Sequence, residues 1–162
     1  MPETKDVNLT VNGRAHQLAL PSHRTLLEAL RALGYVEVKS GCEKGDCGAC
    51  AVLLDGEAID SCLTLAWTAD GGSVTTVKGL GGPDGAHPLQ DAFIREGSVQ
   101  CGYCIPGIIV AAKALLDETP DPSDAELRRG LSGNLCRCTG YVRIFSAIRE
   151  AAAVLRQGGE RA

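Results

Sequence analysis

Apolar and polar residues alternate near the start of the chain, in the two-residue period of a half-buried strand. The alternation covers residues 7–11, stops at an Asn-Gly pair at residues 12–13, and resumes over residues 18–20. Asn-Gly between two alternating segments is a strong signal for a two-residue hairpin turn. The pattern therefore predicts a β-hairpin in this part of the chain.

A short helix and a second group of strands follow. Residues 25–28 (Thr-Leu-Leu-Glu) form a capping-box pattern, and leucines at helical spacing continue from it to Gly34. A second hairpin is predicted over residues 51–63, around an Asp-Gly pair, and a last strand over residues 73–77. Strands, one helix and strands again describe a small α+β unit.

In the second half of the chain the apolar period changes to about 3.6 residues, the period of an amphipathic helix. The change follows a segment rich in glycine and proline at residues 78–88. Helices are predicted over residues 106–116, over residues 123–130 after a second capping box, and from residue 139 onward. The second half is therefore predicted to be all-helical.

We expect two domains from this change of period. An α+β domain is predicted at residues 1–79, a linker at residues 80–88, and an all-helical domain at residues 89–162. The apolar run at residues 108–110 (Ile-Ile-Val) suggests more apolar surface than a small helical domain can bury alone, and so favours a protein partner.

Composition and charge are those of an ordinary globular protein. The 162 residues are 44% apolar and 22% charged, with a net charge of −4. Lysine and arginine form no cluster, which argues against nucleic acid as a partner. The first residues lack the pattern of a secretory signal and no apolar stretch is long enough for a membrane span, so we expect a cytoplasmic protein. The histidines have no partners at metal-ligand spacing and are expected to be ordinary surface residues; they are His16, His23 and His87.

The eight cysteines carry the candidate chemistry, and they fall into two groups of four, one in each predicted domain. In the first group, three cysteines share a glycine-rich loop with the spacing Cys-x4-Cys-x2-Cys, and the fourth follows after eleven residues. This spacing is typical of plant-type [2Fe–2S] sites. The glycines let the backbone fold around an inorganic core and direct N–H groups at the sulfurs. The members of this group are Cys42, Cys47, Cys50 and Cys62.

The second group has the spacing Cys-x2-Cys and then, after thirty-one residues, Cys-x-Cys. Both pairs precede predicted helices, whose N-termini present free N–H groups to thiolates. The spacing favours a cluster, but a zinc site stays open for this group taken alone. The members are Cys101, Cys104, Cys136 and Cys138.

Two other interpretations of the cysteines need weighing. Disulfides would suit an exported mini-protein, but the sequence shows no export signal. Structural zinc is the main alternative, because four-cysteine zinc sites are common and two of them would stabilise two small domains. The Cys-x4-Cys-x2-Cys loop argues against zinc in the first domain, since zinc knuckles normally come as two Cys-x2-Cys pairs.

Four motifs, in this order, resemble the small iron–sulfur subunit of the molybdenum hydroxylases, the xanthine dehydrogenase family. The motifs are GCEKGDCGAC at residues 41–50, the later Cys62, QCGYCIPG at residues 100–107, and GNLCRCTGY at residues 133–141. The resemblance covers nearly the whole chain and departs from the family at no ligand position.

The resemblance implies a fold, cofactors and partners. The first domain would be a β-grasp, plant-type ferredoxin-like domain, and the second a four-helix bundle, each with one [2Fe–2S] cluster. A large partner subunit would carry molybdenum–molybdopterin cytosine dinucleotide, and a medium partner subunit would carry FAD. The three subunits would assemble as a dimer of heterotrimers.

For single residues, the resemblance implies that all eight cysteines are cluster ligands. Gln100 matches a position that hydrogen-bonds the pterin, and Cys138 matches the ligand that lies between cluster and pterin. Electrons would pass from molybdenum to the helical domain's cluster, then to the first domain's cluster, and then to FAD. This chain would hold no catalytic residue and no substrate site.

The predicted function is therefore electron transfer within an oxidoreductase complex that hydroxylates an N-heteroaromatic compound. Purines, aldehydes and carbon monoxide are alternative substrates for such a complex. Alternatives of another class are a free-standing two-cluster ferredoxin and a zinc-stapled adaptor without a redox role.

Overall fold

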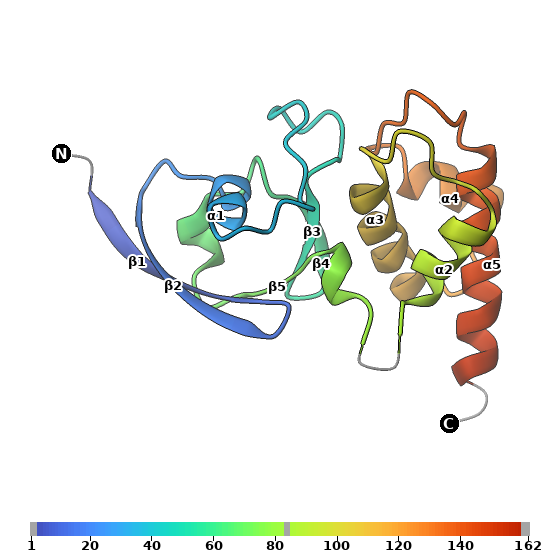
Figure 1. The fold of residues 1–162 in the computed structure, drawn as a ribbon, viewed down its shortest axis with the longest axis horizontal. Helices are drawn as coiled ribbons and strands as arrows, with labels where there is room; N and C mark the ends of the chain where they lie inside the picture. Colours follow the sequence, from blue (N-terminus) through green and yellow to red (C-terminus); the bar gives the residue numbers. More distant parts are fainter. Residues whose placement is uncertain (1–2, 83–84, 160–162) are drawn as a thin grey trace.

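The structure, a computed structural model, describes residues 3–82 and 85–159, which form two lobes side by side (Figure 1). In these residues the sheet lobe holds a five-stranded sheet with one α-helix, and the helical lobe holds four α-helices. Each lobe has a hydrophobic core of its own. The architecture is α+β, as predicted.

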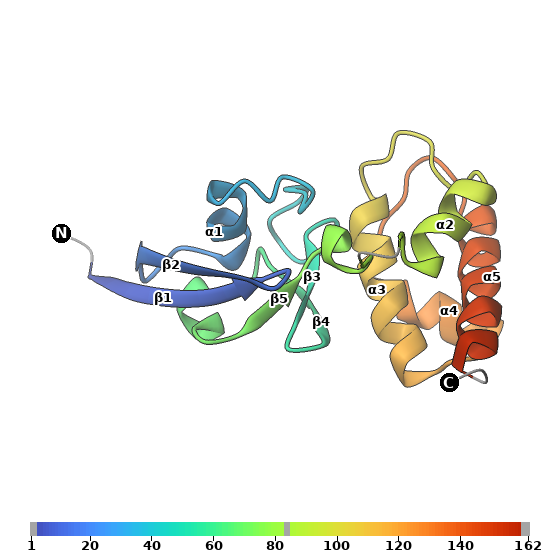
Figure 2. The same cartoon turned by 60° about the horizontal axis from the view of Figure 1, so that its bottom comes forward.

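The sheet of the first lobe is mixed, with the strand order β2-β1-β5-β3-β4. Neighbouring strands are antiparallel except β1 and β5, which are parallel. Helix α1 covers one face of the sheet and buries its leucines there (Figure 2). The elements are β1 (Thr4–Val11), β2 (Arg14–Pro21), α1 (Leu26–Ala32), β3 (Ala51–Leu54), β4 (Glu57–Asp60) and β5 (Ser73–Thr75), with a short 3-10 helix η1 (Ala66–Ala69) before β5.

Local signals place the first hairpin and α1 where the sequence predicts them. Asn12 and Gly13 adopt φ values of 50° and 79°, the left-handed conformation that a tight hairpin turn requires. Thr25 and Glu28 form a reciprocal capping box, in which each side chain accepts a hydrogen bond from the backbone N–H of the other residue. Gly34, with φ of 93°, follows the last turn of α1.

Two strands of the sheet lobe are shorter than predicted. Strand β4 ends at Asp60, because the Leu63 N–H and the Thr64 hydroxyl both turn back to the Asp60 carbonyl. Strand β5 ends at Thr75, because the Thr76 side chain caps a single 3-10 turn, η2 (Val77–Gly79). Cys62 therefore lies in a turn and not on a strand.

Helix α3 lies between the sheet lobe and the other helices, and α2 packs against α5 (Figure 1). Since α3 is enclosed, Ile108, Ile109 and Val110 are 0%, 4% and 0% exposed. The expectation that this run needs a protein partner to bury it is wrong, because the chain buries it by itself. The four helices are α2 (Pro88–Arg95), α3 (Ile105–Glu118), α4 (Asp124–Gly130) and α5 (Val142–Gly159). Over residues 3–82 and 85–159, no helix combines the length and the apolar content that crossing a membrane requires.

Helix α2 was not predicted, and its first residue falls in the segment predicted to be a linker. His87 is its N-cap: the Leu89 N–H donates to His87 Nδ1 at 3.2 Å, and the His87 N–H donates to Gln90 Oε1 at 2.8 Å. The expectation that His87 is an ordinary surface residue is therefore wrong. Residues 83–84 of the predicted linker lie outside the described residues.

Candidate metal centres

The first cysteine group (the first site) is built mainly by the loop between α1 and β3. Gly41 leaves room for one of these thiols, because a Cβ there would lie only 2.7 Å from Cys47 Sγ and one of the two would have to shift. The N–H groups of Lys44 and Asp46 donate to Cys42 Sγ at 3.4 and 3.3 Å. The Lys44 hydrogen bond, followed by the contact with the Cys47 thiol, lowers the Cys42 pKa to about 7. The loop thus stabilises negative charge on sulfur.

The four thiols of the first site lie in two pairs. Cys42 is in side-chain contact with Cys47, and Cys50 is in side-chain contact with Cys62. Cys50 and Cys62 are buried, whereas Cys42 and Cys47 are partly exposed. Burial raises the Cys50 pKa to about 12, and the Asp60 carboxylate, with Oδ1 3.6 Å from Cys50 Sγ, acts in the same direction. The site therefore has an inner and an outer pair.

The second cysteine group (the second site) shows the same division. Cys101 and Cys138 are exposed, and their Sγ atoms lie 3.6 Å apart. Cys104 is buried at the N-cap of α3 and contacts the Cys136 thiol. Burial raises the Cys104 pKa to about 12, and Cys136 and Cys101 add to the effect. The structure thus brings together all four cysteines that the sequence assigned to this site.

Tyr141 holds the segment that carries Cys136. The Cys136 N–H donates to the Tyr141 hydroxyl at 2.7 Å, and this hydroxyl donates to the Asn134 carbonyl at 2.8 Å. Thr139 Oγ1 lies 3.1 Å from Cys136 Sγ. Burial acts to raise the Cys136 pKa, but the hydrogen bonds from Thr139, Cys138 and Cys104 together outweigh it, and the pKa is lowered.

The paired arrangement of the thiols bears on which metal group they fit. A structural zinc site needs four ligands around one ion, at about 2.3 Å for sulfur. Within the part of the chain that the structure describes, no three Cys, His, Asp or Glu side chains converge on one such point. A [2Fe–2S] core takes two protein ligands on each of its two irons. Two thiol pairs per site fit this core better than they fit one zinc ion.

The two sites are connected directly across the lobes. The Leu135 N–H, next to Cys136, donates to the Cys47 carbonyl at 3.0 Å. The side-chain amide of Asn134 donates to the Gly48 carbonyl at 3.1 Å, and this bond is buried. The loops that carry the two cysteine groups are therefore held against each other.

Asn134 and Tyr103 contribute contacts between the sites that sequence reasoning missed. Asn134 is 6% exposed, although a Gly-Asn pair in a sequence usually indicates an exposed turn. The Tyr103 hydroxyl donates to the Ser40 carbonyl of the first loop. The bonded residues are 86 and 63 positions apart, so no local pattern could have indicated them.

The predicted pterin contacts lie on the surface of the helical lobe. Gln100 is exposed, and so are its neighbour Cys101 and Cys138. Large apolar side chains next to the second site in the sequence are exposed as well, namely Val99, Tyr103, Leu135 and Val142.

Comparison with known proteins matches both lobes to iron–sulfur families. Residues 9–73 match the family described as "2Fe-2S iron-sulfur cluster binding domain". Residues 76–149 match the family described as "[2Fe-2S] binding domain". The two families meet at residues 73–76, next to the turn η2.

Individual relatives cover almost the whole chain. The nicotinate dehydrogenase small FeS subunit of Eubacterium barkeri is 45% identical over 146 residues, which are 90% of this chain and 93% of that protein. In the crystal structure of quinoline 2-oxidoreductase from Pseudomonas putida 86, one chain is 42% identical with a TM-score of 0.90, covering 96% of this chain and 98% of that one. The aldehyde oxidoreductase of Desulfovibrio desulfuricans is 46% identical with a TM-score of 0.89, covering 94% of this chain but 17% of that one.

Two cysteine-bearing lobes that match these families define a two-domain [2Fe–2S] iron–sulfur protein whose first domain is ferredoxin-like. More narrowly, the chain belongs to the family of small iron–sulfur subunits of the molybdenum hydroxylases.

Proposed function

We propose that this chain is the electron-transfer subunit of a molybdenum-dependent hydroxylase, and that each of its sites holds one [2Fe–2S] cluster. The observation that carries the proposal is the arrangement of the thiols as pairs in both lobes, with the two cysteine loops hydrogen-bonded to each other. When bound, such clusters supply one-electron redox chemistry. The proposed ligands are Cys42, Cys47, Cys50 and Cys62 for the first site, and Cys101, Cys104, Cys136 and Cys138 for the second.

The chain's own residues have three tasks in this proposal. Backbone N–H groups such as that of Lys44 stabilise thiolate charge at the first site. Burial of Cys50 and Cys104 keeps water from the inner pair of each site. The Leu135–Cys47 hydrogen bond keeps the two sites close, which favours transfer between them. The reaction with substrate takes place elsewhere in the complex.

We infer that the exposed surface at Gln100, Cys101 and Cys138 faces the large, molybdenum-binding subunit. Without a partner, this chain would leave the thiols of Cys101 and Cys138 in water. The exposed apolar side chains beside them are suited to a protein interface. In this arrangement Gln100 hydrogen-bonds the pterin of molybdopterin cytosine dinucleotide, and Cys138 is the ligand nearest to it. A medium subunit with FAD and a dimer of heterotrimers complete the proposed assembly.

We also propose a division of the chain into a β-grasp domain at residues 1–79, a linker at 80–88 and a four-helix bundle at 89–162. Separate cores in the two lobes support the division. Val77 and Leu80 nevertheless pack in the helical core, so the boundary region is shared. A cytoplasmic location stays a prediction that cell fractionation tests.

For the substrate of the complex we propose an N-heteroaromatic compound. Nicotinate and quinoline, named for two relatives, each contain a six-membered aromatic ring with one nitrogen. An aldehyde is the second candidate, because a relative of similar identity is an aldehyde oxidoreductase.

Purification of the tagged chain with its natural partners tests the proposal. We expect molybdenum and FAD to copurify with about four irons per chain, and nicotinate-like or quinoline-like compounds to bleach the visible absorbance. Iron without molybdenum or FAD would support a free-standing ferredoxin instead. If only aldehydes bleached the visible absorbance of the complex, an aldehyde would be its substrate and the N-heteroaromatic proposal would be wrong.

A further inference from the structure

The segment by which the chain leaves the sheet lobe is held by both lobes at once. Val77 and Leu80 pack against the core of the helical lobe. Their neighbours Thr76 and Lys78 instead make polar contacts with the sheet lobe. Residues 76–80 (the shared turn) are therefore a joint between the lobes and not a free linker.

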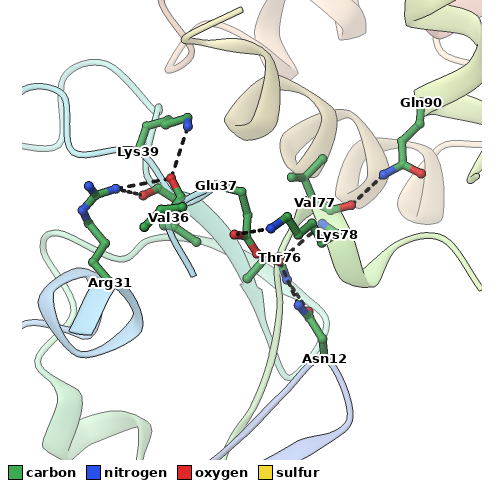
Figure 3. Close-up of polar contacts among 10 residues, drawn as sticks. Asn12, Arg31, Val36, Glu37, Lys39, Thr76, Val77, Lys78 and Gln90 are labelled. Carbon is green, nitrogen blue, oxygen red and sulfur yellow. Dashed lines mark hydrogen bonds and ion pairs between the residues drawn. The ribbon is translucent and has the colours of Figure 1, made fainter. Parts of the chain in front are cut away.

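A buried carboxylate, Glu37, lies at the centre of this joint (Figure 3). Glu37 is 7% exposed, and its Oε1 accepts a hydrogen bond from the Thr76 hydroxyl at 2.9 Å. The Lys78 ammonium lies 3.3 Å from Oε2, close enough for charge attraction, and Oε2 accepts no hydrogen bond from any described residue. Both partners of the carboxylate thus come from the shared turn.

Asn12 and Gln90 attach the shared turn to one lobe each (Figure 3). The Thr76 N–H donates to Asn12 Oδ1 at 2.8 Å, and Asn12 Nδ2 donates to the Thr76 hydroxyl oxygen at 2.9 Å. From α2, Gln90 Nε2 donates to the Val77 carbonyl at 2.7 Å. Asn12 belongs to the hairpin turn of the sheet lobe, so the shared turn connects three distant parts of the chain.

The backbone that carries Glu37 is itself fixed by two cationic side chains. The Arg31 guanidinium donates to the Val38 carbonyl at 2.7 Å, and the Lys39 ammonium donates to the Val36 carbonyl at 3.2 Å (Figure 3). The backbone on either side of Glu37 is therefore held by hydrogen bonds that do not involve the shared turn.

Movement of the shared turn away from the sheet lobe would leave the Glu37 carboxylate buried without its hydrogen bond and its ion pair. Burial of an unpaired charge is strongly unfavourable, far more so than the loss of an exposed ion pair. The carboxylate thus resists displacement of the turn, and with it displacement of the helical core in which Val77 and Leu80 are packed.

We propose that Glu37 is a positioning residue that locks the shared turn and so, together with the direct hydrogen bonds between the cysteine loops, fixes the separation of the two cysteine sites. Its connection to electron transfer rests on the proposed function, because only loaded sites exchange electrons. Glu37 touches neither site and acts solely through the placement of one lobe on the other.

The test uses the full chain with both clusters loaded and reduced by dithionite. The readout is the magnetic splitting that each cluster's electron paramagnetic resonance signal shows when the other is also reduced, since this splitting depends steeply on their separation. Glu37→Ala is expected to weaken and broaden the splitting. Glu37→Gln, which keeps a hydrogen-bonding group but loses the charge facing Lys78, is expected to give a smaller change in the same direction.

Val52→Ala is the matched control. Val52 is fully buried in the core of the sheet lobe and is not one of the residues whose hydrogen bonds or ion pair form the joint. We expect this variant to lower the unfolding temperature and to leave the splitting at its wild-type value. A splitting that fell equally in Val52→Ala would overturn the proposal, because general destabilisation would then explain the effect.

A second readout does not depend on the clusters. The Gly79 N–H donates to the Thr76 carbonyl within the shared turn. Hydrogen exchange of this amide is expected to be faster in both Glu37 variants and unchanged in Val52→Ala. Wild-type splitting and wild-type exchange in Glu37→Gln would overturn the lock, even if Glu37→Ala failed to fold. If the wild-type chain showed no pair of cluster signals, the proposed electron-transfer function would be contradicted, but the role of Glu37 would not. The hydrogen-exchange experiment would then still test whether Glu37 locks the shared turn.

Discussion

At the scale of single residues, burial and hydrogen bonding act on the thiols in opposite directions. The backbone N–H of Lys44 lowers the Cys42 pKa, whereas burial raises the pKa of Cys50 and of Cys104. A buried thiol with a raised pKa is inert until something replaces its proton, and a bound metal does so. The inner pairs are therefore suited to holding metal and unsuited to reacting with oxidants in water.

The assignment of the second site predicts a selective loss in Cys104→Ser. We expect iron to fall from about four to about two per chain, with the first site's spectrum retained and turnover of the complex abolished. Iron analysis and electron paramagnetic resonance check this. Cys42→Ser is the matched variant, and it should remove the other signal. Survival of both signals in Cys104→Ser would show that Cys104 is not a ligand.

Asp60 is predicted to lower the reduction potential of the first site. Its carboxylate lies 3.6 Å from Cys50 Sγ, and reduction adds negative charge there. In Asp60→Asn the midpoint potential should become more positive by tens of millivolts, since about 1 kcal/mol of charge interaction corresponds to roughly 40 mV for one electron. A redox titration measures it.

The control for Asp60 is Glu57→Gln, which removes one charge from an exposed position on the same strand. This variant should leave both potentials unchanged. Equal shifts in the two variants would point to the net charge of the chain and not to the contact with Cys50.

At the scale of elements, the sequence predicts those turns and helix ends whose interacting residues are close together in the chain. The turn at Asn12-Gly13 and the capping boxes at Thr25 and Ser123 form as predicted because their partners are within four residues. Helix α2 was missed because histidine is not among the usual capping residues. The burial of α3 could not be predicted, since the helical core covers one side and β3, far away in the sequence, covers another.

The His87 cap predicts a pH dependence of stability. Burial lowers the His87 pKa, Lys113 adds to the effect, and Asp117 opposes it. Because the folded-state pKa is lowered, the contribution is fully present above the unfolded value of about 6.5 and is lost as the pH falls through the folded value. Protonated Nδ1 can no longer accept the Leu89 N–H.

Urea unfolding at pH 7.5 and at pH 5 measures this dependence. His87→Asn keeps a capping acceptor but does not titrate, so it should lose less stability than the wild type between the two pH values. His87→Ala should cost about 1 kcal/mol at the higher pH. Equal losses in the wild type and in His87→Asn would show that the cap does not titrate.

The packing of α3 against the first loop predicts a cost for Gly107→Ala. A Cβ at Gly107 would overlap the Gly48 carbonyl oxygen, and the backbone of a tight loop cannot move away cheaply. We expect a loss of about 1–3 kcal/mol in the free energy of unfolding. Gly158→Ala is the control, because nothing lies within 4 Å of its Cβ position, and helix propensity should stabilise it by up to about 1 kcal/mol. Equal changes in the free energy of unfolding in Gly107→Ala and Gly158→Ala would contradict the close contact between Gly107 and Gly48.

At the scale of the whole molecule, the loops that carry the cysteines connect two lobes with separate hydrophobic cores. The class of protein and its metal groups could be predicted, because ligand spacing is a local property of the chain. The connection between the sites could not be predicted. It depends on contacts such as Asn134 with Gly48 and Glu37 with Thr76, whose partners are 86 and 39 positions apart.

Electron paramagnetic resonance of the dithionite-reduced chain, purified with its partners and analysed for iron and zinc, tests the central claim most directly. We predict two distinct [2Fe–2S] signals, split by each other, and about four irons per chain. A silent spectrum with stoichiometric zinc would contradict the electron-transfer function and leave a structural, zinc-stapled adaptor.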